Sequence, residues 1–275
     1  MKVALVTDSN AQMPAVLLER YAVRVVPLTI VVDGEEYREG VDLDPSWFYE
    51  RLAAGAEVST AAPSPGSVLA AYEAVAAGGA DAILSVHIGS NTSATLNSAS
   101  IAARSSPVPV TLVDTGTASF AIGCCVWSAG SCLARGGTLD EARHAAESVA
   151  TTIGNVFVVG ALDRAAHGGR LASNAVAGIG APVLALENGS MNPVARARDA
   201  ADAVGAMVEY VTTASGGVAQ RIGVGDACAD ELADELVAGL RAADNGHEIV
   251  RYEVGPSVGA HTGAGTVGAV FFPRG

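Results

Sequence analysis

The segment Asp81-Ala-Ile-Leu-Ser-Val-His-Ile88 is followed by the turn Gly89-Ser-Asn-Thr-Ser-Ala-Thr95 and by helical periodicity up to Arg104. Its near-continuous apolar run is typical of a parallel strand that is covered on both faces. A second such run, residues 109–114, follows the helical stretch. Strand, helix and strand in this order predict an α/β unit with a parallel sheet.

The same alternation extends over the N-terminal half of the chain. Residues 2–6 predict a first strand, which ends in Thr7-Asp8-Ser9, and residues 23–32 predict another. Asp33-Gly34 is a hairpin signal that leads into residues 35–37. Helices are expected at residues 14–21, 45–54, 67–77, 93–104 and 119–135. We therefore expect residues 1–152 to form an N-terminal α/β domain with a mainly parallel sheet.

The C-terminal half has a different pattern. Strands are expected at residues 156–159, 183–186, 221–224, 249–254 and 268–272, and helices at 200–213 and 230–241. Asn188-Gly189 is a second hairpin signal, which predicts antiparallel pairs. Residues 153–275 are therefore expected to form a second α/β domain with a mixed sheet, with the boundary near Thr152.

Composition and charge exclude several classes of partner. Half of the residues are hydrophobic but only 5% are aromatic, so the core is expected to consist of Ala, Val, Leu and Ile. The net charge of −13 argues against nucleic acid, because phosphate binding needs a basic surface. The first residues do not resemble a signal peptide, and no apolar run is long enough to span a membrane. We expect a cytoplasmic protein without stable membrane insertion.

The cysteines do not indicate a metal site. Cys124, Cys125 and Cys132 fall in one apolar helical stretch, whereas Cys228 is isolated. None has the Cys/His spacing of a zinc site, so buried free thiols and no metal are expected.

A glycine-rich segment near the end of the chain surrounds His261. Gly263-x-Gly265-x-x-Gly268 matches the dinucleotide fingerprint, which requires a helix at its third glycine. Residues 269–273 predict a strand there instead, so a dinucleotide is not expected. His261 remains a candidate ligand-binding residue, in a turn where glycine allows close approach of the backbone.

Hydroxyl side chains follow the predicted strands. In open α/β sheets, ligands bind beyond the carboxyl ends of the strands. Ser90, Ser93 and Thr95 follow one such strand and precede a helix, a natural site for a carboxylate or phosphate. N-capping is the competing interpretation of each, with Ser93 as the expected cap of helix 93–104. A further group, residues 59–64, is expected in a loop between helices.

Arginines in this acidic chain are candidate anion or partner contacts. Arg170 follows paired glycines in His167-Gly-Gly-Arg170, and Arg196-Ala-Arg198 is the densest positive patch. A planar guanidinium suits bidentate anion binding. For Arg196 and Arg198 the alternative is a solvated helix start.

The composition also allows a serine acyl hydrolase. Ser93 or Ser90 could pair with His261, oriented by Asp8 or Asp114, although no Gly-x-Ser-x-Gly motif is present. Structural or solvent-exposed roles are expected for His87, His144 and His247.

Taken in order, the motifs resemble those of the DegV family of bacterial fatty-acid-binding proteins over nearly the whole chain. Residues 7–9, 26–28, 114–115 and 168–170 match the family motifs T-D-S, V-P-L, D-S/T and G-G-R. Residues 60–64, 88–95, 196–198 and 255–265 resemble T-S-Q-P-S, I-S-S-x-L-S-G-T, K-x-R and G-P-x-x-G-x-H-x-G-P-G, with Ala61, Ala62, Gly89 and Ala264 in place of the family's Ser, Gln, Ser and Pro. Thr92 and Ala94 replace the family's Leu and Gly beside Ser93, whose hydroxyl is retained.

The resemblance implies two α/β domains with one long-chain fatty acid, such as palmitate or oleate, in an apolar tunnel between them. It assigns the carboxylate to Thr60 and Ser93, with His261 and Arg170 in a nearby polar network. It also implies that a separate fatty acid kinase phosphorylates the bound acid to an acyl phosphate. The protein would then be a non-catalytic carrier without a cofactor, and Arg196 and Arg198 would be candidate contacts with the kinase.

Overall fold

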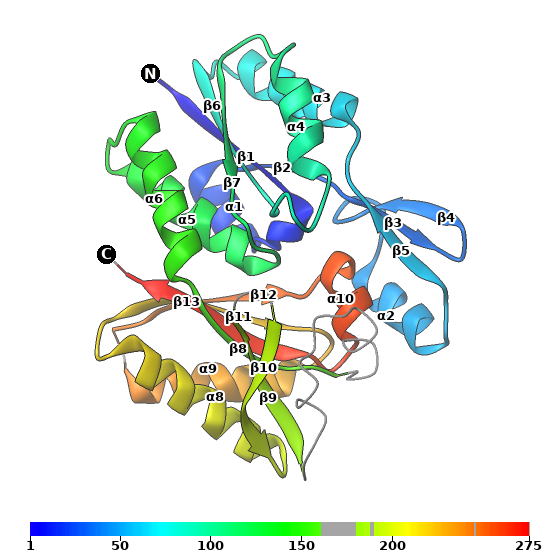
Figure 1. Cartoon of the computed structure of the whole chain (residues 1–275), viewed down its shortest axis with the longest axis vertical. Coiled ribbons are helices and arrows are strands. Elements are labelled where there is room, and N and C mark those ends of the chain that lie inside the picture. Colours follow the sequence, from blue (N-terminus) through cyan, green and yellow to red (C-terminus); the bar gives the residue numbers. More distant parts are fainter. Residues whose placement is uncertain (161–179, 188–189, 245, 275) are drawn as a thin grey trace. The chain divides into compact units, whose positions relative to one another are not determined.

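The computed structural model describes residues 1–160, 180–187, 190–244 and 246–274. The chain divides into two compact units (Figure 1). Unit 1 consists of residues 1–44 and 56–152, and unit 2 of residues 45–55 and 153–275. The helix α2 (Pro45–Ala53) therefore belongs to unit 2, although its neighbours in sequence belong to unit 1.

Unit 1 contains the predicted parallel sheet. Its strands are β1 (Val3–Asp8), β2 (Arg24–Val26), β6 (Ala82–His87) and β7 (Val110–Asp114), in the order β2-β1-β6-β7. All three strand pairs are parallel, and every residue of β6 is buried. The α/β unit expected from residues 81–114 is confirmed.

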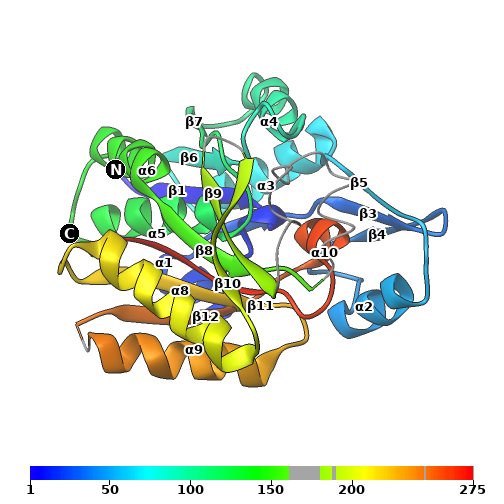
Figure 2. The same cartoon turned by 60° about the horizontal axis from the view of Figure 1, so that its bottom comes forward.

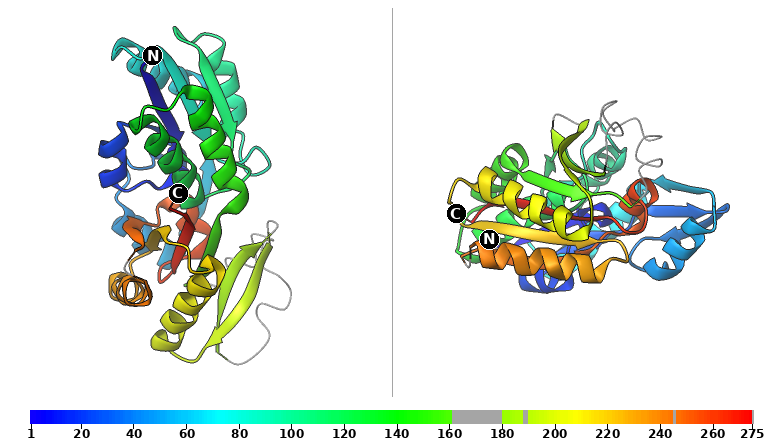
Figure 3. Two further views of the ribbon diagram at one scale, coloured as in Figure 1. Left: turned by 90° about the vertical axis from the view of Figure 1, so that its left-hand side faces the viewer. Right: turned by 90° about the horizontal axis from the view of Figure 1, so that it is seen from below.

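Helices cover both faces of this sheet. On one face α3 (Pro65–Ala77) packs against α4 (Thr95–Ala103). On the other face α1 (Ala15–Tyr21) packs against α5 (Phe120–Ala134), and α5 lies beside α6 (Leu139–Thr152) (Figures 1 and 3). The sequence prediction did not include α6.

A second, antiparallel sheet in unit 1 corrects two predictions. It consists of β3 (Thr29–Val32), β4 (Glu35–Arg38) and β5 (Val58–Ala61), in the order β4-β3-β5. The single strand expected at residues 23–32 is two strands in different sheets, separated by Pro27, which has no N–H to donate to a ladder. Residues 58–61, expected partly as a loop, form β5. The hairpin predicted at Asp33-Gly34 is confirmed, with φ angles of 50° and 88°.

Unit 2 contains the predicted mixed sheet. Its strands are β8 (Gly154–Val158), β9 (Ala181–Glu187), β10 (Ser190–Ala197), β11 (Gln220–Asp226), β12 (Glu248–Glu253) and β13 (Val267–Pro273). Their order is β10-β9-β8-β13-β11-β12. The pair β11–β12 is parallel and the other described pairs are antiparallel. The sequence prediction missed β10. Asn188 and Gly189 lie outside the described residues.

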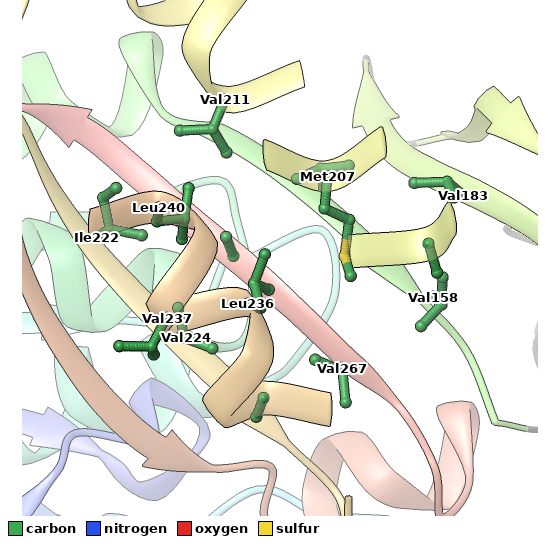
Figure 4. Close-up of a cluster of buried hydrophobic side chains, with 14 of the residues drawn as sticks. Val158, Val183, Met207, Val211, Ile222, Val224, Leu236, Val237, Leu240 and Val267 are labelled. Atoms are coloured by element: carbon green, nitrogen blue, oxygen red, sulfur yellow. The ribbon is translucent and has the colours of Figure 1, made fainter. Parts of the chain in front are cut away.

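Two helices, α8 (Ala200–Ser215) and α9 (Asp230–Ala243), lie side by side on one face of this sheet (Figure 2). Met207 from α8 and Leu236 from α9 meet Ile222, Val224 and other aliphatic side chains of the strands in a fully buried core (Figure 4). The aliphatic core expected from the low aromatic content is therefore present in this unit.

The glycine-rich segment around His261 is a helix and not the expected turn. Helix α10 (Pro256–Thr262) begins with Pro256 at an accepted first position and ends before Gly263, whose φ is 78°. The strand predicted after it is confirmed, because Gly268 lies in β13. Helix α10 packs against α2, where the Tyr49 hydroxyl donates a hydrogen bond of 2.5 Å to the Val254 carbonyl.

No helix among the described residues combines the length and apolar character that a membrane span requires.

Candidate functional site

The carboxyl ends of the parallel strands in unit 1 bring polar side chains together. Asp8 ends β1, His87 ends β6 and Asp114 ends β7. Asp8 Oδ2 accepts a hydrogen bond of 3.0 Å from the Ile88 N–H and lies 2.9 Å from His87 Nδ1. Polar side chains therefore lie at the ends of these strands, as predicted. Asp8 connects the end of β1 to the end of β6.

Asp114 holds the turn that follows β6. Its Oδ1 accepts hydrogen bonds from the N–H groups of Ser90 (3.1 Å) and Gly116 (3.0 Å), and its Oδ2 accepts one of 2.5 Å from the Ser90 hydroxyl. Burial alone would raise the pKa of this carboxyl, but the hydrogen bonds from Ser90 and Gly116 outweigh it and hold the pKa below its usual 3.8. Ser90 is therefore tied to a carboxylate of its own unit.

Ser93 and Thr95 form a hydroxyl pair at the start of α4. Their oxygens are 2.8 Å apart, and Ser93 Oγ accepts a hydrogen bond of 3.2 Å from the Thr95 N–H. Helix α4 begins at Thr95 with Ala94 as N-cap, two residues later than predicted, so Ser93 is not the cap. Thr95 is buried and Ser93 half-buried. Two hydroxyls beside the amide groups of a helix N-terminus can bind a carboxylate.

Thr60 lies on β5, where it pairs with Ile30 of β3, and it is exposed. Ser64, further along the same hydroxyl-rich segment, is the N-cap of α3 and accepts a hydrogen bond of 3.1 Å from the Ser67 N–H. The competing N-cap interpretation therefore holds for Ser64. The Thr60 hydroxyl remains a candidate group for binding the ligand.

A buried chain of polar groups extends from Asp8 into the interior of unit 1. His87 Nε2 lies 2.7 Å from Ser85 Oγ, which lies 2.9 Å from Tyr72 Oη. Burial raises the pKa of Tyr72, and the contact with Ser85 partly offsets the rise. All four side chains are fully buried. Sequence reasoning missed the partners of His87; the signal was the position of an Asp and a His at the ends of neighbouring strands.

These contacts bear on the hydrolase alternative. Asp8, His87 and Ser85 have the composition of a catalytic triad, but their complete burial keeps a substrate from Ser85. Within unit 1, Asp8 contacts His87 and Asp114 contacts Ser90.

In unit 2, His261 lies in the last turn of α10 and is exposed. The backbone after it is fixed by hydrogen bonds. The Gly265 N–H donates to the Ala227 carbonyl (2.7 Å), and the Thr266 hydroxyl lies 2.8 Å from the Gly263 carbonyl. Gly265 has a φ of 87°, a conformation that glycine adopts without strain. The glycine motif therefore ends α10 and anchors it to the sheet.

Arg196 and Arg198 lie on and just after β10, and not at the helix start that was the alternative interpretation. Arg196 lies on β10 and donates a hydrogen bond of 3.2 Å to the Gly180 carbonyl. Arg198 follows β10 and is exposed. It forms an ion pair of 2.5 Å with Asp202, and the hydrogen bond that it donates to this carboxylate raises the pKa of the guanidinium. Neither starts a helix, because α8 begins at Ala200. Arg170 lies outside the described residues. In the described part of the chain no cluster of three His, Cys, Asp or Glu side chains could hold a metal ion.

Comparisons with known proteins point to one family. A family model described as "Uncharacterised protein, DegV family" matches residues 2–274. A DegV domain-containing protein of Streptomyces coelicolor is 36% identical over 277 residues, which cover 99% of each chain.

Solved structures agree with this match. A structure described as fatty acid binding of a DegV family protein from Thermus thermophilus aligns with a TM-score of 0.86 and 31% identity, over 99% of this chain and 100% of that one. DegV of Bacillus subtilis, described as a fatty acid binding protein, aligns with a TM-score of 0.85 and 27% identity over 100% of both chains.

Proposed function

Since the chain belongs to the DegV family, we propose that it binds a long-chain fatty acid and presents the carboxylate to a separate fatty acid kinase. The observation that carries the proposal is the pair of hydroxyls of Ser93 and Thr95 at the start of α4. Similar proteins of Thermus thermophilus and Bacillus subtilis are described as fatty acid binding, which supports this choice of anion.

Hydroxyl groups suit the binding of a carboxylate that must remain reactive. Hydrogen bonds to a charged group are stronger than neutral ones, so Ser93 and Thr60 could hold the carboxylate without a lysine or arginine salt bridge. The positive end of the α4 dipole adds to the attraction. Burial of the alkyl chain in an apolar tunnel would contribute about 0.8 kcal/mol per methylene. The alkyl chain of the fatty acid would then supply most of the affinity, and the hydroxyls would orient its carboxylate.

The remaining roles follow the family motifs. Thr60 and Ser93 are proposed to bind the carboxylate, with His261 and Arg170 completing its polar surroundings. Arg196 and Arg198 are proposed to contact the kinase, which would form the acyl phosphate. The protein itself would be a carrier and not the catalyst.

Mass spectrometry of the purified full-length chain after solvent extraction tests the proposal. We expect a co-purified fatty acid with a chain similar to palmitate or oleate, and binding of added palmitate by the delipidated protein. An extract without fatty acid, together with no binding of palmitate or oleate, would overturn the proposal. Hydrolysis of acyl esters that disappears in His261→Ala would favour the hydrolase instead.

A further inference from the structure

We propose that Asp8 and His87 are positioning residues for the carboxylate-binding turn at Ser93, an inference that rests on the proposed function. Both side chains are fully buried in unit 1, and neither is among the residues expected to touch the ligand. They act through the backbone that connects β6 to α4.

The first step concerns how Asp8 holds the turn. Asp8 Oδ2 accepts the hydrogen bond of the Ile88 N–H, the first amide after β6. The next residue, Gly89, accepts a hydrogen bond of 3.1 Å from the Ser93 N–H through its carbonyl. A displacement of Ile88 would therefore move the acceptor that holds Ser93. The Asp8 carboxylate is thus linked through Ile88 and Gly89 to Ser93, which is proposed to bind the ligand.

The second step concerns how His87 orients Asp8. A carboxylate oxygen that accepts from the Ile88 N–H can accept a second hydrogen bond from His87 Nδ1–H. His87 Nε2 is then the acceptor for the Ser85 hydroxyl, which in turn accepts from the Tyr72 hydroxyl. The donors of the chain thus point in one direction, from Tyr72 towards Asp8. The Tyr72 end anchors the imidazole to α3.

Stability alone does not account for these groups. A buried pair of ionisable side chains is often replaced by apolar residues with little or no loss of stability. Moreover, Asp8 Oδ1 has no hydrogen-bond partner within the described residues, so this carboxyl is not a fully satisfied structural group. A precise position for the Ile88 N–H explains why a carboxylate and an imidazole occupy these two strand ends. Supporting residues of this kind commonly orient those that touch a ligand.

Two substitutions of His87 separate positioning from mere packing. His87→Asn retains an amide N–H near the place of Nδ1 and loses the contact with Ser85, whereas His87→Gln retains an amide near Nε2 and loses the donor to Asp8. Both leave a buried amide of similar polarity. Palmitate affinity is measured by calorimetry on the delipidated full-length variants, at a temperature where urea titration shows each to be folded. Val68→Ala, which shortens a fully buried side chain of the unit 1 core, is the control for lost stability.

We expect His87→Gln to weaken palmitate binding about tenfold or more, as for a lost hydrogen bond to a charged group, while His87→Asn and Val68→Ala stay within about threefold of the unaltered protein. Amide hydrogen exchange at Ser93 should accelerate in the Gln variant only. If the unaltered protein binds palmitate but the two His87 variants bind it with equal affinities, the inference is overturned and the proposed function is not. Failure of the unaltered protein to bind palmitate would overturn the proposed function as well.

Discussion

The ring of Tyr49 occupies the space that a side chain at Gly259 would need. A Cβ atom built on Gly259 would lie 2.2 Å from Tyr49 Oη and 2.7 Å from Cζ of the same ring. Glycine at this position therefore allows α10, which carries His261, to pack closely against α2. The contact joins two segments of unit 2 that are far apart in the sequence.

Gly259→Ala should destabilise unit 2 by about 1–3 kcal/mol, because the added methyl group forces the Tyr49 ring or α10 to move. Urea unfolding monitored by circular dichroism measures the change. Gly205→Ala is the matched control, since Gly205 lies inside α8 and a Cβ there would meet no atom within 4 Å. That substitution should stabilise the protein by about 0.5–1 kcal/mol, through the better helix propensity of alanine. Equal effects of the two substitutions would contradict the role of close packing at Gly259.

Ser93→Ala should weaken palmitate binding by about 1–3 kcal/mol, because it removes a hydrogen bond to a charged carboxylate. Thr60→Val should act in the same direction. Calorimetric titration of the delipidated variants gives the affinities. Ser105→Ala, at an exposed residue beyond the end of α4, should bind palmitate as the unaltered protein does. An unchanged affinity of Ser93→Ala would remove Ser93 from the ligand site.

The sequence predicted the features of the fold that depend on local pattern. The strand at residues 82–87 and the helix after its polar turn have clear periodicity, and both are present, although the helix begins two residues later than predicted. Helix α10 was missed although Pro256 and Gly263 mark its ends, because glycines and only seven residues obscure its periodicity.

Features that depend on distant contacts could not be predicted. The association of α2 with unit 2 is determined by its packing against α10, and no local pattern encodes that partner. The contact between Asp8 and His87 joins residues 79 positions apart and requires the parallel register of β1 and β6. The hydroxyls of Ser93 and Thr95 could be identified from sequence, whereas the contact between the Asp8 carboxylate and the His87 imidazole could not.

The pKa of Asp114 should lie below 3.8 in the folded protein, and Ser90→Ala should raise it. A carboxyl whose folded pKa is lowered stabilises the folded state above its unfolded pKa. The contribution is lost as the pH falls from about 3.8 through the folded value. Carbon-13 NMR titration of the Asp side chains measures the midpoint, with Ser105→Ala as control. A midpoint that Ser90→Ala leaves unchanged would contradict the hydrogen bond from the Ser90 hydroxyl to Asp114.

The thiols should differ in reactivity according to their surroundings. Burial raises the pKa of Cys125 to about 12 and that of Cys124 well above 9.0, so neither should react with iodoacetamide until the protein unfolds. Cys228 is exposed, but partial burial, followed by repulsion from the Glu253 and Asp226 carboxylates, raises the pKa of its thiol above 9.0. Because only the thiolate reacts, Cys228 should be alkylated slowly at neutral pH and faster as the pH rises.

Peptide mass spectrometry after timed alkylation measures these rates at each cysteine. Glu253→Gln should accelerate alkylation of Cys228 at pH values near neutrality, since it removes a negative charge that disfavours the thiolate. Alkylation in urea, where all four cysteines are exposed to solvent, provides the reference rate. Modification of Cys124 or Cys125 in the folded protein at the rate seen in urea would contradict their burial in α5. An unchanged rate in Glu253→Gln would show that burial, and not the neighbouring carboxylate, controls the Cys228 thiol.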